Sequence, residues 1–348
     1  MSKKVGILTG GGDAPGLNQV IRAAVYQGVK KYDFEFVAIP DGWKGLLEGE
    51  SYPLSLDDVK DWIVEGGSLI GSTRTNPFKI ENGGEKCREN FEKMGLTAIL
   101  ALGGEDTLST AYKLYSEHKI PTVGAPKTID NDLPGTDQCF GFDTAINRVM
   151  EAFDRLRTTA RSHHRILVIE VMGRHAGWMT LLGGIAGGAD IILLPEEPFT
   201  FDKVAEKLKR LKKQGRKYAL VAVSEGAKME FAEGTDIITQ DAQLDEFGHV
   251  RLGGIAKILA KEMQERIDWE ARYVVLGHLQ RGGAPTAFDR WFSTRLGIAA
   301  VDQIAQENFG VMVVLKGSKI TSVSLKEAAK GIRTVPKQFI ELAKIFEP

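Results

Sequence analysis

The chain has 348 residues, of which 43% are hydrophobic and 26% charged. This is the composition of a folded globular protein long enough for two domains, and it excludes a largely disordered chain. Lys plus Arg number 45 and Asp plus Glu number 46. The near-neutral balance excludes a strongly basic surface for nucleic acid or an anionic membrane, so any anion site must be built locally.

Cysteine content and apolar stretches indicate the compartment. Two cysteines, Cys87 and Cys139, are too few for a disulfide framework and are typical of a reducing environment. The first residues lack the long apolar core of a signal peptide. The longest apolar stretch, 181–195, is interrupted by Asp190 and is too short to span a bilayer. We therefore expect a cytoplasmic protein.

Short apolar runs recur along the chain and predict strands. They lie at residues 5–8, 34–39, 98–102, 122–124, 166–171, 191–194, 218–223, 273–276 and 311–315. Between them, segments 17–25 and 146–153 carry apolar residues at helical spacing. This alternation predicts an α/β protein with doubly wound, mainly parallel sheets, in which ligands bind beyond the carboxyl ends of strands. The Lys-rich segment 207–217 is interpreted as the solvated face of a helix and its following turn.

A glycine-rich turn follows the first predicted strand. Residues 9–18 read TGGGDAPGLN, and a helix is expected to begin near Pro15. The glycines allow close approach of the backbone to a ligand, and the N–H groups with the helix N-terminus favour an anion such as phosphate. The spacing matches neither G-x-G-x-x-G nor a P-loop. A turn that binds no ligand is the alternative.

Two further turns after predicted strands carry carboxylates. Residues 102–107 read LGGEDT, and adjacent carboxylates at a strand end suit a Mg²⁺ held mainly by phosphate oxygens and water. Residues 126–135 read PKTIDNDLPG. In an extended stretch Asp130 and Asp132 would point the same way, so that one is a candidate general base. Turn capping by these side chains is the alternative interpretation.

Arginines gather at the ends of the apolar runs. Arg74 and the segments 161–165, 172–175 and 277–283 have this position. In a nearly neutral protein they indicate phosphate recognition by fixed, bidentate side chains, although a single arginine on a loop is usually only solvated.

The motifs GGEDT, TIDND, EVMGR and GHLQRGG occur in this order, and with them the chain resembles the phosphofructokinase family over essentially its whole length. The resemblance implies Mg²⁺-dependent phosphorylation of the C1 hydroxyl of fructose 6-phosphate, a step of glycolysis. It also implies two lobes with the active site in the cleft between them. The expected phosphoryl-donor lobe is 1–141 plus about 280–330, and the sugar-phosphate lobe is about 142–279 plus 331–348.

The resemblance also implies residue roles. Asp130 would be the general base, with Thr128 and Asp132 beside it, and Arg174 would stabilise the charge of the transition state. Glu105 would be the carboxylate linked to Mg²⁺. The implied donor-binding residues are Gly11, Gly12, Arg74, Gly104, Asp106, Thr107 and Lys127. The implied sugar-phosphate pocket contains Arg165, Met172, Gly173, Arg174, Glu225, Arg272, His278 and Arg281. Arg165 would reach into a neighbouring subunit, which implies a homodimer or homotetramer.

Two positions bear on the phosphoryl donor. In the bacterial ATP-dependent pattern glycines stand where this chain has Asp106 and Lys127. A carboxylate there conflicts with the α-phosphate of ATP, whereas the lysine suits a small, dense anion. The chain thus resembles the pyrophosphate-dependent branch. An ATP-dependent enzyme is the alternative, because Trp43 stands where ATP-using relatives have an aromatic near the adenine. A non-catalytic sugar-phosphate sensor is disfavoured by the presence of Asp130 and Glu105.

Overall fold

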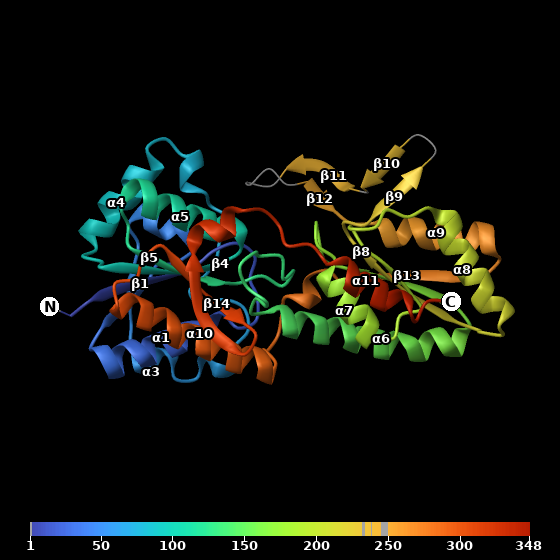
Figure 1. Ribbon diagram of the computed structural model, residues 1–348, viewed down its shortest axis with the longest axis horizontal. Helices are drawn as coiled ribbons and strands as arrows, with labels where there is room; N and C mark the ends of the chain where they lie inside the picture. The colour runs from blue at the N-terminus through green and yellow to red at the C-terminus, as the bar shows by residue number, and fades with distance from the viewer. Residues whose placement is uncertain (1, 232–233, 238, 245–249) are drawn as a thin grey trace. The chain divides into compact units, whose positions relative to one another are not determined.

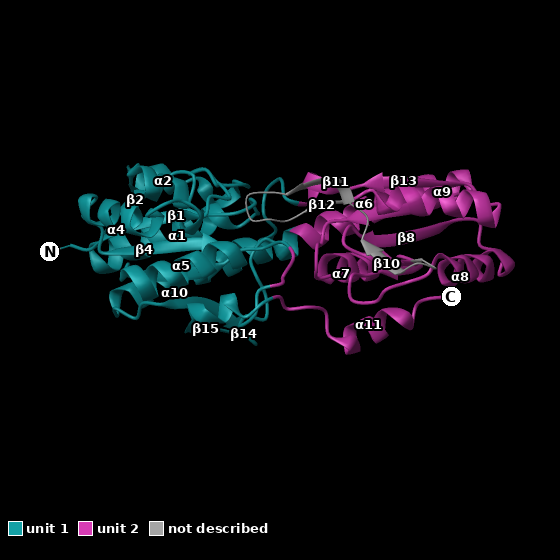
Figure 2. Ribbon diagram, turned by 90° about the horizontal axis from the view of Figure 1, so that it is seen from above, with its two compact units in different colours: residues 1–129, 133–144, 281–331 teal, residues 130–132, 145–280, 332–348 magenta. Residues whose placement is uncertain are grey.

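The computed structural model describes residues 2–231, 234–237, 239–244 and 250–348. Figure 2 shows its two compact units in different colours. The first contains residues 1–129, 133–144 and 281–331, and the second contains 130–132, 145–280 and 332–348. Each unit is therefore assembled from three separate segments of the chain.

The first unit is built on a seven-stranded sheet with the order β15-β14-β5-β4-β1-β2-β3. The inner strands are parallel, while β3 and β15 are antiparallel strands at the two edges. The bounds are β1 (Lys4–Thr9), β2 (Glu35–Ala38), β3 (Tyr52–Leu54), β4 (Ala98–Gly103), β5 (Thr122–Pro126), β14 (Val311–Lys316) and β15 (Lys319–Ser324).

Helices cover both faces of this sheet (Figure 1). One face is covered by α1 (Leu17–Tyr32) and α10 (Ala287–Ala305), and the other by α4 (Gly83–Lys93) and α5 (Glu105–His118). Successive side chains of a strand point to opposite faces. Ile7 accordingly packs in one core cluster and Leu8 in the other. The remaining helices of this unit are α2 (Trp43–Glu48) and α3 (Leu56–Val59).

The second unit has a four-stranded parallel sheet with the order β13-β6-β8-β7. Its core cluster packs the sheet against α8 and α9. The strands are β6 (Ile166–Val171), β7 (Ile191–Leu193), β8 (Ala219–Ser224) and β13 (Ala271–Val275), and the helices are α7 (Trp178–Ala186), α8 (Phe201–Lys213), α9 (Ile255–Ile267) and α11 (Lys337–Lys344). Helix α6 (Phe142–His163) starts in the first unit and continues in the second. Two hairpins pair β9 (Lys228–Phe231) with β10 (Gly234–Ile237) and β11 (Thr239–Leu244) with β12 (Val250–Leu252).

The predicted fold class is confirmed. Each predicted strand run overlaps an observed strand, and the two helical patterns lie in α1 and α6. The Lys-rich segment 207–217 runs from α8 into the following turn, as predicted. The helix expected to start near Pro15 is confirmed. Helix α1 begins two residues later, at Leu17, and its N-cap Gly16 has φ 107°, a left-handed conformation outside the helix.

The strands that the sequence did not predict are β3, β15 and those of the two hairpins. Strand β15 has no buried residue, so it lacks the apolar run by which the inner strands were recognised. Among the described helices, none has both the length and the apolar character that a membrane span requires.

Candidate active site

The first glycine turn is fixed by backbone hydrogen bonds within the first unit. Gly10 N donates to Leu102 O at 2.9 Å, and Gly11 N donates to Thr73 O at 2.8 Å. Ser72 Oγ donates to Gly11 O at 2.7 Å. Gly11 has φ 81°, a conformation that favours glycine. These bonds join the turn to the segment that continues into the exposed Arg74.

Two cationic side chains reach the same turn. Lys127 is only 4% exposed, and its Nζ donates to Gly12 O. Arg281 Nη1 donates to Asp13 O at 3.0 Å. A Cβ added at Gly12 would lie 2.7 Å from that Nη1 atom, so a larger residue there would displace the end of the arginine side chain. The resemblance assigned Arg281 to the sugar-phosphate pocket, whereas its contact here is with the donor turn.

The second glycine turn joins this group. Lys127 N donates to Gly103 O at 2.9 Å. Gly104 is the N-cap of α5, whose first turn contains Glu105 and Asp106. Thr107 is 3% exposed, and its Oγ1 lies 2.5 Å from the position of a Cβ at Gly10. The first unit therefore brings most of the predicted donor residues to adjacent turns.

The chemistry of Glu105 fits the predicted role with Mg²⁺. Its carboxylate accepts a hydrogen bond from Ser109 Oγ at 3.2 Å and stands at the carboxyl end of β4. The described residues contain no group of three or more His, Cys, Asp and Glu that could hold a metal ion. A single carboxylate oxygen donor in the first turn of α5 is a ligand of the kind that Mg²⁺ takes beside phosphate and water.

The turn that carries the candidate base differs from expectation. Asn131 is 4% exposed and has φ 52°. The interpretation of 130–132 as an extended stretch, with both aspartates pointing the same way, is therefore wrong, because a left-handed residue between them ends the alternation of side chains. Thr128 precedes this turn, directly after Lys127.

Arg333 holds the turn from the far end of the sequence. Its Nη2 and Nε donate to Asn131 O at 2.8 and 3.2 Å, and its backbone N donates to Asp132 O at 2.7 Å. Trp178 Nε1 donates in turn to Arg333 O at 2.9 Å. Sequence reasoning did not identify Arg333, because no motif surrounds it.

In the second unit, the carboxyl ends of β6 and β8 bring part of the predicted sugar-phosphate set together. Gly173 N donates to Glu225 Oε1 at 3.3 Å, and Met172 N donates to Gln280 Oε1 at 3.2 Å. Gln280 belongs to a 3₁₀ turn, Gly277–Gln280, that carries His278. Gly173 has φ 143°. Gln280 was not predicted as a site residue, although it lies within the GHLQRGG motif.

The electrostatics of this group are centred on Glu225. Burial, followed by the negative charge of Asp130, raises the pKa of Glu225 to about 7, against the opposing effects of Gly173 N–H and Arg174. Two carboxylates that interact in this way do not ionise independently. Glu225 can therefore change its charge close to neutral pH.

Arg165 and Arg272 lie at the opposite end of the same sheet. Arg165 precedes β6, and Arg272 is paired with Leu167 near the start of that strand. Both arginines form ion pairs with Glu270, at 2.9 and 2.6 Å. At about 3.3 Å per residue, most of the six residues of β6 separate them from Met172. Within the second unit, the predicted sugar-phosphate residues are thus divided between the two ends of the sheet, whereas Arg281 belongs to the first unit.

Trp43 does not offer a ring for a nucleotide base. It is 2% exposed and packs in the core cluster with Ile39, Leu46 and Phe91. The aromatic residue that favoured ATP in the sequence is a core residue of the first unit.

The model of the family described as Phosphofructokinase matches residues 4–304. The chain belongs to the phosphofructokinase family. A curated relative named pyrophosphate--fructose 6-phosphate 1-phosphotransferase, from Amycolatopsis methanolica, is 51% identical over 99% of both chains. Another, named ATP-dependent 6-phosphofructokinase 3, from Streptomyces coelicolor, is 46% identical over 96% of both. Among solved structures, a pyrophosphate-dependent phosphofructokinase from Marinobacter aquaeolei aligns with a TM-score of 0.83 and 25% identity, covering 97% of this chain and 86% of that one.

These phosphofructokinases include both donor classes. Family membership by itself therefore leaves the choice between pyrophosphate and ATP to the residues around the donor turns.

Proposed function

We propose that this phosphofructokinase transfers a phosphoryl group reversibly between pyrophosphate and fructose 6-phosphate, forming fructose 1,6-bisphosphate and orthophosphate. The observation that carries the choice of donor is the position of Lys127. Lys127 is 4% exposed as a residue, and its ammonium group donates to the carbonyl of Gly12 in the first glycine turn.

A buried lysine at this turn favours a compact anion. Its charge is screened less than that of a surface lysine, and it is concentrated where the terminal phosphate of any donor must lie. Asp106, in the first turn of α5, adds a carboxylate that repels the additional phosphate of ATP. Trp43 is buried in the core and supplies no compensating contact with adenine.

The remaining donor residues neutralise the transferred group. We assign the N–H group of Gly12 and the closely approaching backbone of Gly11, whose own N–H donates to Thr73 O, together with Arg74, to the donor phosphates. Gly104 and Thr107 complete the donor turns. Mg²⁺, when bound, would neutralise the oxygens of the phosphates, and Glu105 would help to hold it. Phosphoryl transfer needs mainly such positioning and neutralisation from a protein.

On the sugar side, Asp130 accepts the proton of the C1 hydroxyl, with Thr128 and Asp132 beside it, and Arg174 stabilises the charge that develops on the transferred group. We assign Met172, Gly173, Glu225, His278 and Arg281 to binding of the sugar phosphate. Contacts remote from the reacting atoms orient the substrate. In this assignment the donor residues belong to the first unit, and the sugar-phosphate residues other than Arg281 belong to the second.

Arg165 and Arg272 require a second copy of the chain. They share Glu270 at the far end of β6, and we propose that they reach the sugar phosphate of a neighbouring subunit in a cytoplasmic homodimer or homotetramer. The resemblance implied this for Arg165 alone. Because Arg272 also pairs with Glu270, we propose the same role in a neighbouring subunit for Arg272.

Initial rates with fructose 6-phosphate and Mg²⁺ test the donor, comparing pyrophosphate with ATP. The variants are wild type, Asp106→Gly/Lys127→Gly and, as a matched control, Lys119→Gly at an exposed residue of positive φ. We expect the wild type and the control to use pyrophosphate and the double variant to lose that activity. Equal or faster wild-type rates with ATP would establish the ATP-dependent alternative instead. Binding of fructose 6-phosphate without turnover of either donor would indicate a sensor.

A further inference from the structure

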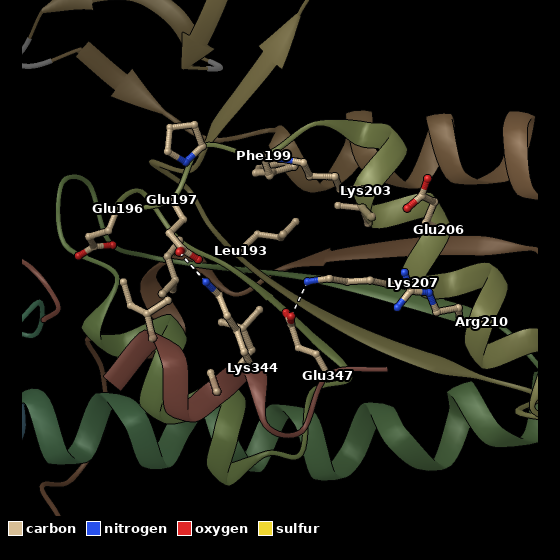
Figure 3. Close-up of a pocket in the computed structure, with 16 residues that line it drawn as sticks. Leu193, Glu196, Glu197, Phe199, Lys203, Glu206, Lys207, Arg210, Lys344 and Glu347 are labelled. Carbon is tan, nitrogen blue, oxygen red and sulfur yellow. Dashed lines mark hydrogen bonds and ion pairs between the residues drawn. The ribbon is translucent and has the colours of Figure 1, made fainter. Parts of the chain in front are cut away.

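A cavity of about 560 Å³ lies in the second unit, beyond the end of β7 and between α8 and α11 (Figure 3). Its volume is within the range of small-molecule sites. None of the residues assigned above to phosphoryl transfer lines it. The cavity is therefore separate from the residues of the proposed reaction.

Helix α8 supplies three cationic side chains to the lining. Lys203, Lys207 and Arg210 follow at i, i+4 and i+7, so they share one flank of the helix. The buried face of the same helix contains Val204 and Leu208. The cations are held along the cavity because the apolar face fixes the rotation of the helix about its axis.

The carboxylates of the lining are mostly occupied by other partners. Glu196 accepts hydrogen bonds from Gly177 N and Val335 N. Glu197 pairs with Lys344 at 2.7 Å.

Glu206 points away from the Lys207–Glu347 pair in Figure 3. Within the described part of the chain, no carboxylate forms an ion pair with Lys203 or Arg210. The flank of α8 therefore retains positive charge.

Glu347 is held in the cavity by Lys207. The two side chains form an ion pair, and that of Glu347 is 13% exposed. Its neighbours Ile345 and Phe346 are 75% and 68% exposed. Apolar side chains are usually buried and glutamates are usually exposed. At this end of the chain the apolar side chains are exposed and the glutamate is sheltered. The attraction of Glu347 to the cationic flank accounts for this arrangement.

We propose that the cavity is a second ligand site, for a small phosphate-bearing molecule with an apolar body. The phosphate replaces the Glu347 carboxylate at Lys207 and is also bound by Arg210, since ammonium and guanidinium groups are the usual partners of phosphate. The apolar body lies against Leu193 and Phe199, which line the cavity.

Isothermal titration calorimetry with phenyl phosphate tests this site, with fructose 6-phosphate at saturating concentration to occupy the reaction site. We expect Lys207→Gln/Arg210→Gln to weaken binding on the order of tenfold or more, because charged hydrogen bonds are lost. Lys209→Gln is the matched control, since Lys209 lies on α8 but does not line the cavity. Its binding should equal that of the wild type.

Glu347 gives a second variant with the opposite expected result. Glu347→Gln removes the competing carboxylate and should tighten binding of phenyl phosphate about threefold to tenfold. Glu265→Gln, on α9 and outside the lining, should leave it unchanged. Binding that is equal in the wild type and in Lys207→Gln/Arg210→Gln would overturn the proposal. So would the absence of binding to both wild type and Glu347→Gln. Turnover with pyrophosphate is measured separately, so failure of this site is distinguishable from failure of the proposed reaction.

Discussion

The two units differ in how they bring their predicted site residues together. In the first unit, Gly12, Thr107 and Lys127 meet because three strand-to-helix turns lie side by side at the carboxyl ends of β1, β4 and β5. In the second unit, Gly173 and Glu225 meet at the carboxyl ends of β6 and β8, but Arg165 and Arg272 lie at the opposite end of the sheet.

This difference shows what a parallel sheet can and cannot do for a site. Its strands bring their carboxyl ends to one edge, so residues just after the strands gather there. Residues at the start of a strand stay a strand length away. When a predicted site includes residues from both ends of the strands, the two groups cannot meet within one sheet. A different chain segment or another copy of the chain must then complete the site.

The largest expected effect is that of removing the proposed base. Asp130→Asn should lower kcat by about a thousandfold, because a general base contributes about 10² to 10⁴ in rate. Binding of fructose 6-phosphate should persist. Steady-state rates and calorimetry measure the two quantities. Asp33→Asn, at an exposed residue of positive φ that asparagine tolerates, is the control. Retention of full activity by Asp130→Asn would assign the base to another residue.

The separation of Arg272 from Gly173 and Glu225 in the second unit predicts that each sugar-phosphate site is formed by residues of two subunits. Arg272→Ala should raise KM for fructose 6-phosphate about fiftyfold through the loss of charged hydrogen bonds to phosphate. Co-refolding this variant with Asp130→Asn should produce hybrids that contain some intact sites, with more activity than either parent. Arg266→Ala, an exposed arginine on α9 with ion pairs to carboxylates, is the control for KM. Hybrids no more active than the separate variants would show that Arg272 does not serve a partner's site.

A smaller effect is expected from Arg333, which holds the turn beside the proposed base through Asn131 O. Arg333→Met removes both side-chain hydrogen bonds to Asn131 O and should lower kcat about tenfold, because displacement of the base disturbs the reacting geometry. KM should change little, and Arg333→Lys should recover part of the rate. Lys337→Met, an exposed change on α11, should have no effect. An increase in KM with unchanged kcat would contradict this positioning role.

The last prediction concerns stability and its dependence on pH, and it leaves the reaction rate aside. The pKa of Glu225 is raised to about 7 in the folded protein from an ordinary value of 4.5. The folded state therefore binds more protons between these values, and its stability falls as the pH rises through that range. Glu225→Gln should remove a cost of at most about 3 kcal/mol at pH 8 and almost none at pH 4.5.

Thermal unfolding at the two pH values measures this difference. The increase in Tm for Glu225→Gln over wild type should be greater at pH 8 by about 5 °C. The exposed Glu50→Gln should show no such dependence on pH. An equal change in Tm at both values would mean that Glu225 keeps an ordinary pKa.

Patterns along the chain were enough to predict the α/β class, the inner strands and the glycine turns of the donor residues. They did so because buried parallel strands leave continuous apolar runs and because the glycine positions follow them directly. The edge strand β15 left no such run. The family resemblance supplied the roles of Asp130 and Glu225, which local patterns alone left open.

Which of these residues meet became known from the folded chain. It placed Arg272 beside Arg165 and away from Met172, it placed Trp43 in the core, and it brought Arg333 to Asn131 across 202 positions of sequence. These contacts could not be recognised in the local sequence. Contacts between distant segments depend on strand order and packing, whereas periodicity and turn residues carry information only about neighbours along the chain.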